Sequence, residues 1–175
     1  SRRMNGLSCS RVRTIRRERH VTRERGDGEL KLVRVRTPRD AQTVSALAQM
    51  IAHEYLPQVI GASATDSACS HVMEPEALAT RMHEGYAYDF ITQGGQVIGY
   101  LSYLHQPDEG ELQISELCLA EGFRGSGRGT RALELLGERA QAEGLGTLAV
   151  DVVSADAAAR TFFESTGFSD AGSGG

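Results

Sequence analysis

The sequence predicts an α/β or α+β domain with a mixed sheet flanked by helices, and three observations support this class. Strand-like and helix-like segments alternate, in the order strand, two helices, three strands, helix, strand, helix. Glycine and proline signals separate most of these segments from one another. The chain has 175 residues, 40% of them apolar, which is enough for one domain with a single core.

The first half of the chain contains one clear strand pattern and two clear helix starts. Leucines alternate with charged residues near residue 30, as they do in a strand. A hydroxyl cap at Thr37 followed by Pro38 is a typical helix start. The expected elements are a strand over 30–36, a helix from Pro38 to about His53, a loop or broken helix over 56–72, and a helix from Pro75 to about Gly85.

The second half begins with a β-hairpin pattern, because Gly94 and Gly95 separate two segments rich in β-branched and aromatic residues. A third long strand and a helix ended by Gly144 follow it. The expected elements are strands over 86–93, 96–106 and 111–120, a helix over 126–143, a strand over 147–153 and a helix over about 156–165.

Charge divides the chain into two parts. Residues 1–36 carry a net charge of +8 and the remainder −12, within an overall charge of −4. The first 30 residues lack a sustained apolar period, so we expect a basic, disordered tail before a folded domain over 31–175. A solvated extension is favoured over an Arg-rich transit peptide or a nucleic-acid contact. The acidic remainder favours a cationic partner such as a polyamine, an aminoglycoside or a basic peptide.

Cysteine usage indicates a reducing compartment, and we expect a cytoplasmic protein. The three cysteines are odd in number and far apart, which argues against a disulfide framework. Cys69 and His71, with His83, do not complete a zinc site, so no metal is expected. No apolar run approaches the roughly 18–20 residues that a membrane-spanning helix needs.

The stretch FRGSGRGT, residues 123–130, precedes the helix expected over 126–143 and has the composition of a phosphate-binding corner. Glycines at a helix N-terminus expose unpaired N–H groups and the positive end of the helix dipole. A P-loop is excluded because the chain has a single lysine, Lys31. A Rossmann site is disfavoured because only 24 residues follow Asp151, too few for the further parallel strands.

Two motifs resemble those of the GNAT superfamily of acyl-CoA-dependent N-acetyltransferases. Residues 124–129, RGSGRG, match its Q/R-x-x-G-x-G/A pyrophosphate motif, and residues 156–168 match its Asn-x-x-Ala-x-x-Phe-Tyr segment with the following Gly-Phe. In element order the resemblance spans roughly residues 31–168. It implies a mixed, mostly antiparallel sheet with truncated C-terminal strands. It also implies direct transfer of acetyl from acetyl-CoA to a primary amine of a small molecule or peptide.

The same resemblance implies where acetyl-CoA binds. Strand 116–119 would diverge from strand 147–153 and pair with the pantetheine arm, while main-chain N–H groups of the glycine corner bind the pyrophosphate. A main-chain N–H near Leu119 would polarise the thioester oxygen. The residues implied for binding are Leu117, Cys118, Leu119, Arg124, Gly125, Ser126, Gly127, Arg128, Gly129, Thr130, Asp156, Ala159 and Phe163.

Glu116 is the candidate general base or amine-orienting group, with Glu111 and His105 as rivals. Direct attack requires no cysteine nucleophile, so we expect Cys118 to be a small buried hydrophobe. The sequence does not decide which face of the strand meets the acceptor.

Three departures from the family pattern leave a second interpretation open, a catalytically impaired CoA-binding or regulatory module. Phe163 replaces the tyrosine that commonly protonates the thiolate, which leaves Tyr100, Tyr103, Ser154 or water. Asp156 replaces an asparagine. After Phe168 only SDAGSGG remains, so a sheet edge would need cover from the N-terminal tail or from a second subunit in a homodimer.

Overall fold

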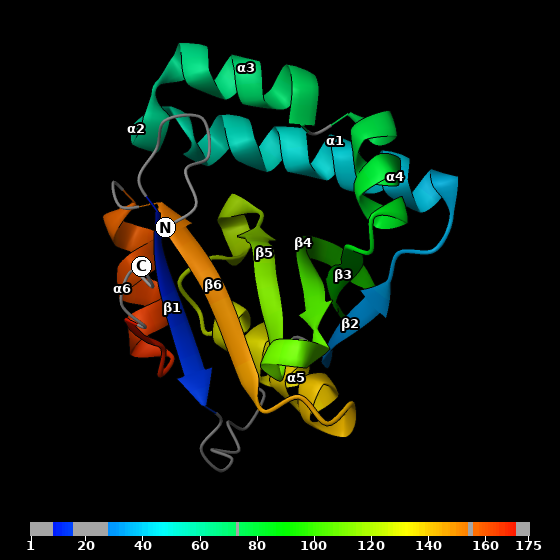
Figure 1. Cartoon of the computed structure of the whole chain (residues 1–175). Coiled ribbons are helices and arrows are strands. Elements are labelled where there is room, and N and C mark those ends of the chain that lie inside the picture. The colour runs from blue at the N-terminus through cyan, green and yellow to red at the C-terminus, as the bar shows by residue number, and fades with distance from the viewer. Residues whose placement is uncertain (1–8, 16–27, 73, 154–155, 171–175) are drawn as a thin grey trace.

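A computed structural model describes residues 9–15, 28–72, 74–153 and 156–170, which form a seven-stranded sheet with helices on both faces (Figure 1). The strands are β1 (Cys9–Ile15), β2 (Leu30–Arg34), β3 (Ala87–Gln93), β4 (Gln96–Gln106), β5 (Glu111–Leu119), β6 (Thr147–Val153) and β7 (Ser169–Asp170). The helices are α1 (Pro38–Tyr55), α2 (Pro57–Ile60), α3 (Ala62–Val72), α4 (Pro75–His83), α5 (Arg128–Ala142) and α6 (Ala157–Ser165), with short 3₁₀ turns η1 (Pro107–Glu109) and η2 (Glu121–Phe123).

Helix α1 begins where the sequence predicts. The Thr37 hydroxyl accepts from the Asp40 N–H while the Asp40 carboxylate accepts from the Thr37 N–H, which makes a capping box. The helix ends at Tyr55, two residues beyond the expected end. The segment expected as a loop or broken helix forms two short helices, α2 and α3, because Pro57 and then Gly61 interrupt it.

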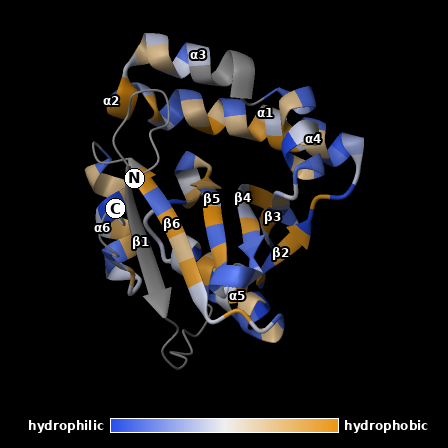
Figure 2. Ribbon diagram, in the orientation of Figure 1, coloured by the Kyte–Doolittle hydropathy of each residue, from blue (hydrophilic) through white to orange (hydrophobic). Residues whose placement is uncertain are grey.

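The sheet order is β2-β3-β4-β5-β6-β1-β7, and every pair is antiparallel except β5–β6. The mixed, mostly antiparallel sheet expected from the sequence is therefore confirmed. One buried cluster lies between the sheet and α1 and α4, and a larger one between the sheet and α5 and α6. Hydrophobic and hydrophilic residues alternate along β5 (Figure 2). Because successive side chains of a strand point to opposite faces, one face of β5 is mostly apolar and the other mostly polar.

The N-terminal part of the chain corrects two expectations. Residues Cys9–Ile15, expected within a disordered tail, form β1 and pair with β6 from Cys9↔Val153 to Ile15↔Thr147. The short strand β7 then pairs with β1, although no strand was expected after Phe168. Since β1 covers the edge of β6, the argument for a homodimer at that edge no longer applies. The other tail residues, 1–8 and 16–27, lie outside the described residues.

Strands β5 and β6 pair over only part of their length. Their parallel register runs from Glu111↔Thr147 to Ile114↔Val150 and stops there. The β4–β5 register shifts at the same level, because Ser102 pairs with Glu116 while Tyr103 pairs with Ile114. Ser115 is thus the extra residue of a β-bulge, and such a bulge bends its strand. Beyond the bulge the two strands diverge, as expected for this fold (Figure 1).

No helix among the described residues is long and apolar enough to cross a membrane.

Candidate acyl-CoA and acceptor site

The glycine corner lies between the end of β5 and the start of α5, so it places main-chain N–H groups at the N-terminus of that helix. Gly125 and Gly127 have φ of 76° and 82°, the left-handed region that glycine adopts without strain. Gly127 is the N-cap of α5 and makes no side-chain cap hydrogen bond. A Cβ at either glycine would meet nothing within 4 Å, so the space in front of this corner is open. An anion can therefore approach the helix N-terminus closely.

Gly129 has a different role from the two glycines before it. A Cβ there would lie 3.0 Å from Cζ of Phe162, a residue of α6. The residue is buried, and its missing side chain lets α6 pack tightly against the first turn of α5. Of the predicted phosphate-binding glycines, Gly129 thus fixes the position of the corner, whereas Gly125 and Gly127 leave it open.

The two arginines of the motif make protein contacts. The Nε of Arg124 donates to the main-chain oxygen of Leu119 at 2.8 Å, and its Nη2 lies 3.2 Å from Oε2 of Glu54. The Nε of Arg128 donates to the side-chain oxygen of Gln93 at 2.6 Å, and Nη1 donates to the hydroxyl of Ser126. Both guanidinium groups are therefore oriented by the protein and add positive charge at the corner.

The diverging part of β5 turns the main chain of two residues toward the gap. Ala120 N–H donates to Ile98 O, and a Cβ on Gly99 would lie 2.2 Å from the Cys118 oxygen, so the main chain of Cys118 faces β4. Because consecutive residues of a strand point their N–H and C=O groups to opposite edges, those of Leu117 and Leu119 face the gap. Of the three residues predicted to pair with pantetheine, Cys118 does not present its main chain there.

Asp156 connects the far side of the gap to α1. Its Oδ1 accepts from the Ala159 N–H at 2.9 Å, which caps α6, and also accepts from the Tyr55 hydroxyl. Burial and the Asp156 carboxylate raise the pKa of Tyr55. The Arg124 guanidinium carbon lies 5.6 Å from the centre of the Tyr55 ring. No sequence motif pointed to Tyr55 or its neighbour Glu54, since both contact residues 70 or more positions away.

Phe163 belongs to the hydrophobic core. Its side chain is buried, and its ring centre lies 5.1 Å from that of Phe162 and 5.2 Å from that of Phe168. Ala159 packs against the same cluster. The position that holds tyrosine in the family motif is thus occupied by a packed aromatic ring without a hydroxyl.

Glu116 points to the face of the sheet that α1 and α4 cover. Its Oε2 accepts from the Ser102 hydroxyl at 3.2 Å, and its Oε1 lies 3.8 Å from Nη1 of Arg81 on α4. The side chain is 20% exposed. Burial raises the pKa of Glu116, and the Arg81 charge and the Ser102 hydrogen bond oppose this rise without cancelling it.

Two tyrosines and a thiol complete the surroundings of Glu116. The hydroxyl of Tyr88 is buried and has no hydrogen-bond partner among the described residues. Burial raises the pKa values of Tyr88 and Tyr100, and it raises the pKa of the Cys118 thiol to about 12. Cys118 packs against the cluster under α1, so it is a neutral, half-buried thiol rather than a thiolate nucleophile, as the sequence predicts.

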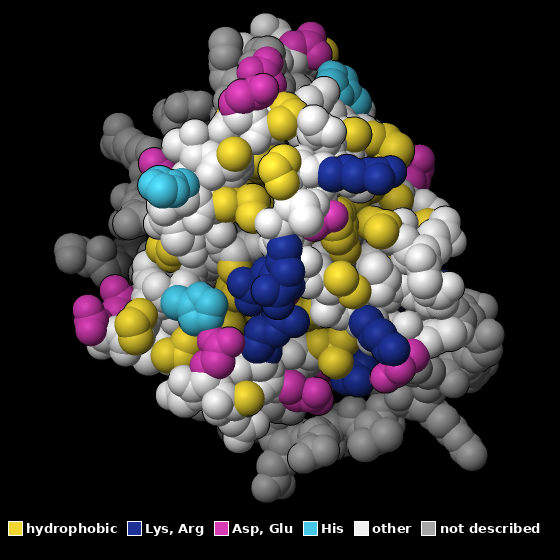
Figure 3. All heavy atoms as spheres, turned by 90° about the vertical axis from the view of Figure 1, so that its right-hand side faces the viewer, with side chains coloured by type: hydrophobic (Ala, Val, Ile, Leu, Met, Phe, Trp, Pro, Cys, Tyr) yellow, Lys and Arg dark blue, Asp and Glu magenta, His cyan; other side chains and the backbone are white. Residues whose placement is uncertain are grey.

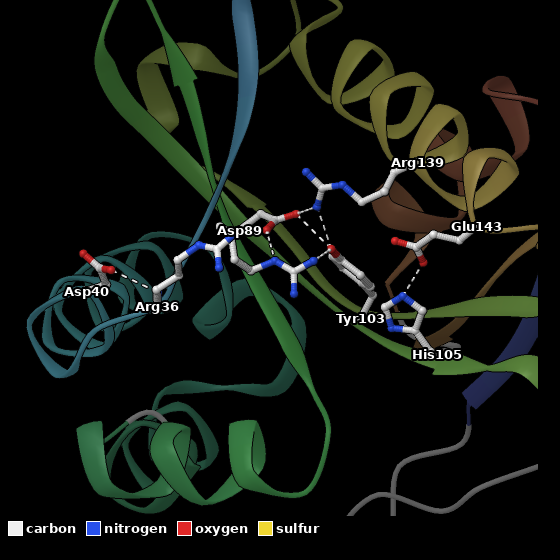
Figure 4. A network of polar contacts seen from close by, with 8 residues as sticks. Arg36, Asp40, Asp89, Tyr103, His105, Arg139 and Glu143 are labelled. Carbon is white, nitrogen blue, oxygen red and sulfur yellow. Dashed lines mark hydrogen bonds and ion pairs between the residues drawn. The ribbon is translucent and has the colours of Figure 1, made fainter.

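The rival bases lie elsewhere. His105 contacts Glu143 beyond the end of α5 at 2.5 Å (Figure 4). Glu111 is buried at the opposite end of β5 from the diverging segment. Tyr103, one of the alternative proton donors, contacts Asp89 and Arg139 on the α5 side of the sheet. Ser154, another, lies outside the described residues, as do the side chains of Cys69 and His71.

The network around Asp89 is structural. Its fully buried carboxylate contacts Arg34 at 3.0 Å, Arg139, and the Tyr103 hydroxyl at 3.1 Å (Figure 4). It ties β2, β3 and β4 to α5. Arginine and lysine side chains gather in the middle of the face at the β2 edge (Figure 3). The side chain of Arg34, a residue of β2, is 35% exposed.

The chain belongs to the acetyltransferase (GNAT) family, whose model matches residues 50–168. A comparison of the sequence with curated proteins finds no significant match.

Several solved structures share the fold. The PaiA N-acetyltransferase from Thermoplasma acidophilum, solved in complex with coenzyme A, has a TM-score of 0.68 at 11% identity over 81% of this chain and 90% of that one. An acetyltransferase from Thermus thermophilus gives a TM-score of 0.59 at 24% identity over 80% and 86% of the two chains. The ribosomal-protein-S18-alanine N-acetyltransferase from Escherichia coli gives a TM-score of 0.59 at 18% identity over 81% and 78% of the two chains. These similarities show the fold.

Proposed function

We propose that this chain transfers an acetyl group from acetyl-CoA to a primary amine of a small molecule or peptide, by direct attack of the amine on the thioester. The observation that carries the proposal is the combination of the helix N-terminus at Gly127, where an added Cβ meets nothing within 4 Å, with the part of β5 that does not pair with β6. The first can hold a diphosphate and the second an extended arm with amide groups.

The groups at the corner fit a diphosphate. In this proposal the N–H groups of residues 125–130 bind it, and the guanidinium groups of Arg124 and Arg128 supply charge from fixed positions. The gap-facing main-chain groups of Leu117 and Leu119 pair with the pantetheine amides. The Leu119 oxygen already accepts from Arg124, so Leu117 is the fully available partner of the two. Coenzyme A in a solved relative supports the choice of acyl-CoA.

Glu116 is the proposed base. It lies beside the bulge from which β5 diverges, and it faces the side of the sheet opposite the α5 core. A carboxylate whose pKa is raised by burial is better matched to taking a proton from an ammonium group than an exposed one is. A gap-facing main-chain N–H of Leu117 or Leu119 would bind the oxygen of the thioester as negative charge develops.

The thiolate leaves without a tyrosine from the family position, because Phe163 is part of the core. Tyr100 remains on the Glu116 side of the sheet, and its raised pKa keeps it protonated. In this proposal Tyr100 or water supplies the proton.

A pair of glycine variants tests acetyl-CoA binding. Gly127→Ala and Gly144→Ala impose the same strain, since both residues have positive φ and open space around the added methyl group. Gly144 follows the other end of α5. Only Gly127→Ala is expected to weaken thermal stabilisation by acetyl-CoA, which for the parent chain should reach about 2.7 kcal/mol at 100 times the Kd.

The parent chain is then assayed for release of free thiol from acetyl-CoA with a panel of amines. Turnover with at least one amine is the expected result. Acetyl-CoA binding without turnover on any amine would instead support the non-catalytic CoA-binding module, and no acetyl-CoA binding would refute both.

A further inference from the structure

We propose that the acceptor is a free α-amino acid and that Arg81 selects it by binding its carboxylate, an inference that rests on the proposed acetyl transfer at Glu116. It narrows the acceptor from primary amines in general to small zwitterions. It also replaces the cationic acceptor that the net charge of the chain favours.

Arg81 reaches the acceptor side of Glu116 from α4. Its Nη2 donates to the hydroxyl of Ser115, the bulge residue, at 2.8 Å. Its guanidinium carbon lies 4.7 Å from the centre of the Tyr86 ring and 5.9 Å from that of Tyr88. The side chain is 22% exposed, so part of it remains accessible. These contacts with the two rings and with the bulge hold the guanidinium in place beside the proposed base.

The guanidinium retains capacity to bind an anion. It has five N–H donors, and among the described residues one of its nitrogens makes a hydrogen bond, to Ser115. Its distance of 3.8 Å from Glu116 is an ion-pair contact and too long for a hydrogen bond. A substrate carboxylate could therefore take charge-assisted hydrogen bonds from donors that Glu116 does not use.

The charges of Glu116 and Arg81 are complementary to those of a zwitterion. Glu116 can pair with its ammonium group and Arg81 with its carboxylate. An amine placed at Glu116 comes within a few ångströms of a guanidinium cation, which repels a purely cationic acceptor. A carboxylate on the carbon next to the amine removes this repulsion by pairing with Arg81. The short separation of the two side chains favours an amine and a carboxylate borne on the same carbon.

Carboxylate binding by Arg81 also affects the base. Arg81 lowers the pKa of Glu116, against the larger effect of burial. When a substrate carboxylate neutralises Arg81, this opposition weakens and Glu116 becomes a stronger base. The correct acceptor would thus strengthen the group that removes its proton.

The test compares L-amino acids with their amides and with the amines that lack the carboxylate, all by free-thiol release from acetyl-CoA. We expect kcat/KM to be roughly 10- to 100-fold higher for the best amino acid than for its amide. Arg81→Gln should remove that preference, mainly by raising KM for the acid. Arg81→Lys keeps the charge but loses the planar fork of the guanidinium. Its preference for amino acids over amides should fall between those of the parent chain and Arg81→Gln. The matched control is Arg39→Gln, at an exposed arginine at the start of α1. It should change neither the preference for amino acids nor their KM.

The possible results distinguish failure of this inference from failure of the proposed function. Turnover of amines and amides as efficient as that of amino acids refutes this inference and leaves the proposed function intact. An equal loss for all acceptors in Arg81→Gln, with KM unchanged, also refutes it, because Arg81 would then only position Glu116 or hold α4. Absence of turnover with every acceptor, while acetyl-CoA binds, refutes the proposed function itself. If Arg81→Gln fails to fold, the comparison is made with Arg81→Lys.

Discussion

Replacing Glu116 by glutamine should abolish most of the activity and leave the protein as stable or more stable at neutral pH. The substitution keeps the shape of the side chain and one acceptor for the Ser102 hydroxyl. It removes the negative charge that faces Arg81. If Glu116 served only as an ion-pair partner of Arg81, its replacement by glutamine would lower the stability and leave the activity unchanged.

The expected sign of the change in stability follows from the pKa of Glu116, which burial raises above 4.5 despite Arg81 and Ser102. The folded protein therefore holds this proton more tightly than the unfolded chain does. The stability that this difference contributes is complete below about pH 4.5 and is lost as the pH rises through the folded-state pKa. Each unit of elevation corresponds to about 1.4 kcal/mol. Glutamine does not ionise, so the variant avoids this loss.

Urea denaturation at pH 5 and pH 8 measures the effect on stability, and thiol release measures activity. The free energy of unfolding of Glu116→Gln, relative to the parent chain, should be higher at pH 8 than at pH 5. Loss of a general base should reduce kcat/KM by about 100- to 10,000-fold. Glu138→Gln, at a 44% exposed carboxylate 3.9 Å from Arg131, is the control and should change little in either assay. A variant that is less stable at pH 8 and retains its kcat/KM would refute the reasoning.

Two further substitutions test contacts that hold distant segments of the fold together. Asp89→Asn should cost about 3 kcal/mol by urea denaturation, the low end for a broken buried ion pair, because Arg34 and Arg139 are 35% and 27% exposed and can reach water. An unchanged unfolding midpoint would show that the network does not stabilise the fold. Tyr55→Phe should cost about 1 kcal/mol through the lost hydrogen bond to Asp156. Equal stability of the variant and parent, measured in the same way, would argue against that bond.

Local signals predicted most of the fold. The capping box at Thr37, the prolines that begin α1 and α4 and the glycines of the β3–β4 turn act within a few residues, so their effects follow from the sequence alone. The glycine corner was predictable for the same reason, since φ above zero and an open helix N-terminus depend on Gly125 and Gly127 themselves.

Contacts between distant segments could not be predicted in this way. Strand β1 pairs with β6 from more than 130 residues away, and its arginine-rich sequence shows no apolar period. Arg81 meets Ser115 across 34 positions, and Arg124 meets Glu54 across 70. Nothing in one short stretch encodes such a pairing, because it depends on how the sheet places α1 and α4 over β5. The face of the sheet toward which Glu116 points could not be predicted for the same reason.

The surroundings of Glu116 favour an enzyme over a CoA-binding module. A module needs the glycine corner and the gap but has no use for a carboxylate beside the bulge. Burial raises the pKa of that carboxylate, and the buried hydroxyl of Tyr88 lies on the same side of the sheet. Carboxylates with pKa values raised in this way are concentrated at functional sites. The loss of the family tyrosine at Phe163 weighs less, since a thiolate is a good leaving group and needs less help than the attacking amine. Thiol release by the parent chain and its loss in Glu116→Gln therefore distinguish the two interpretations.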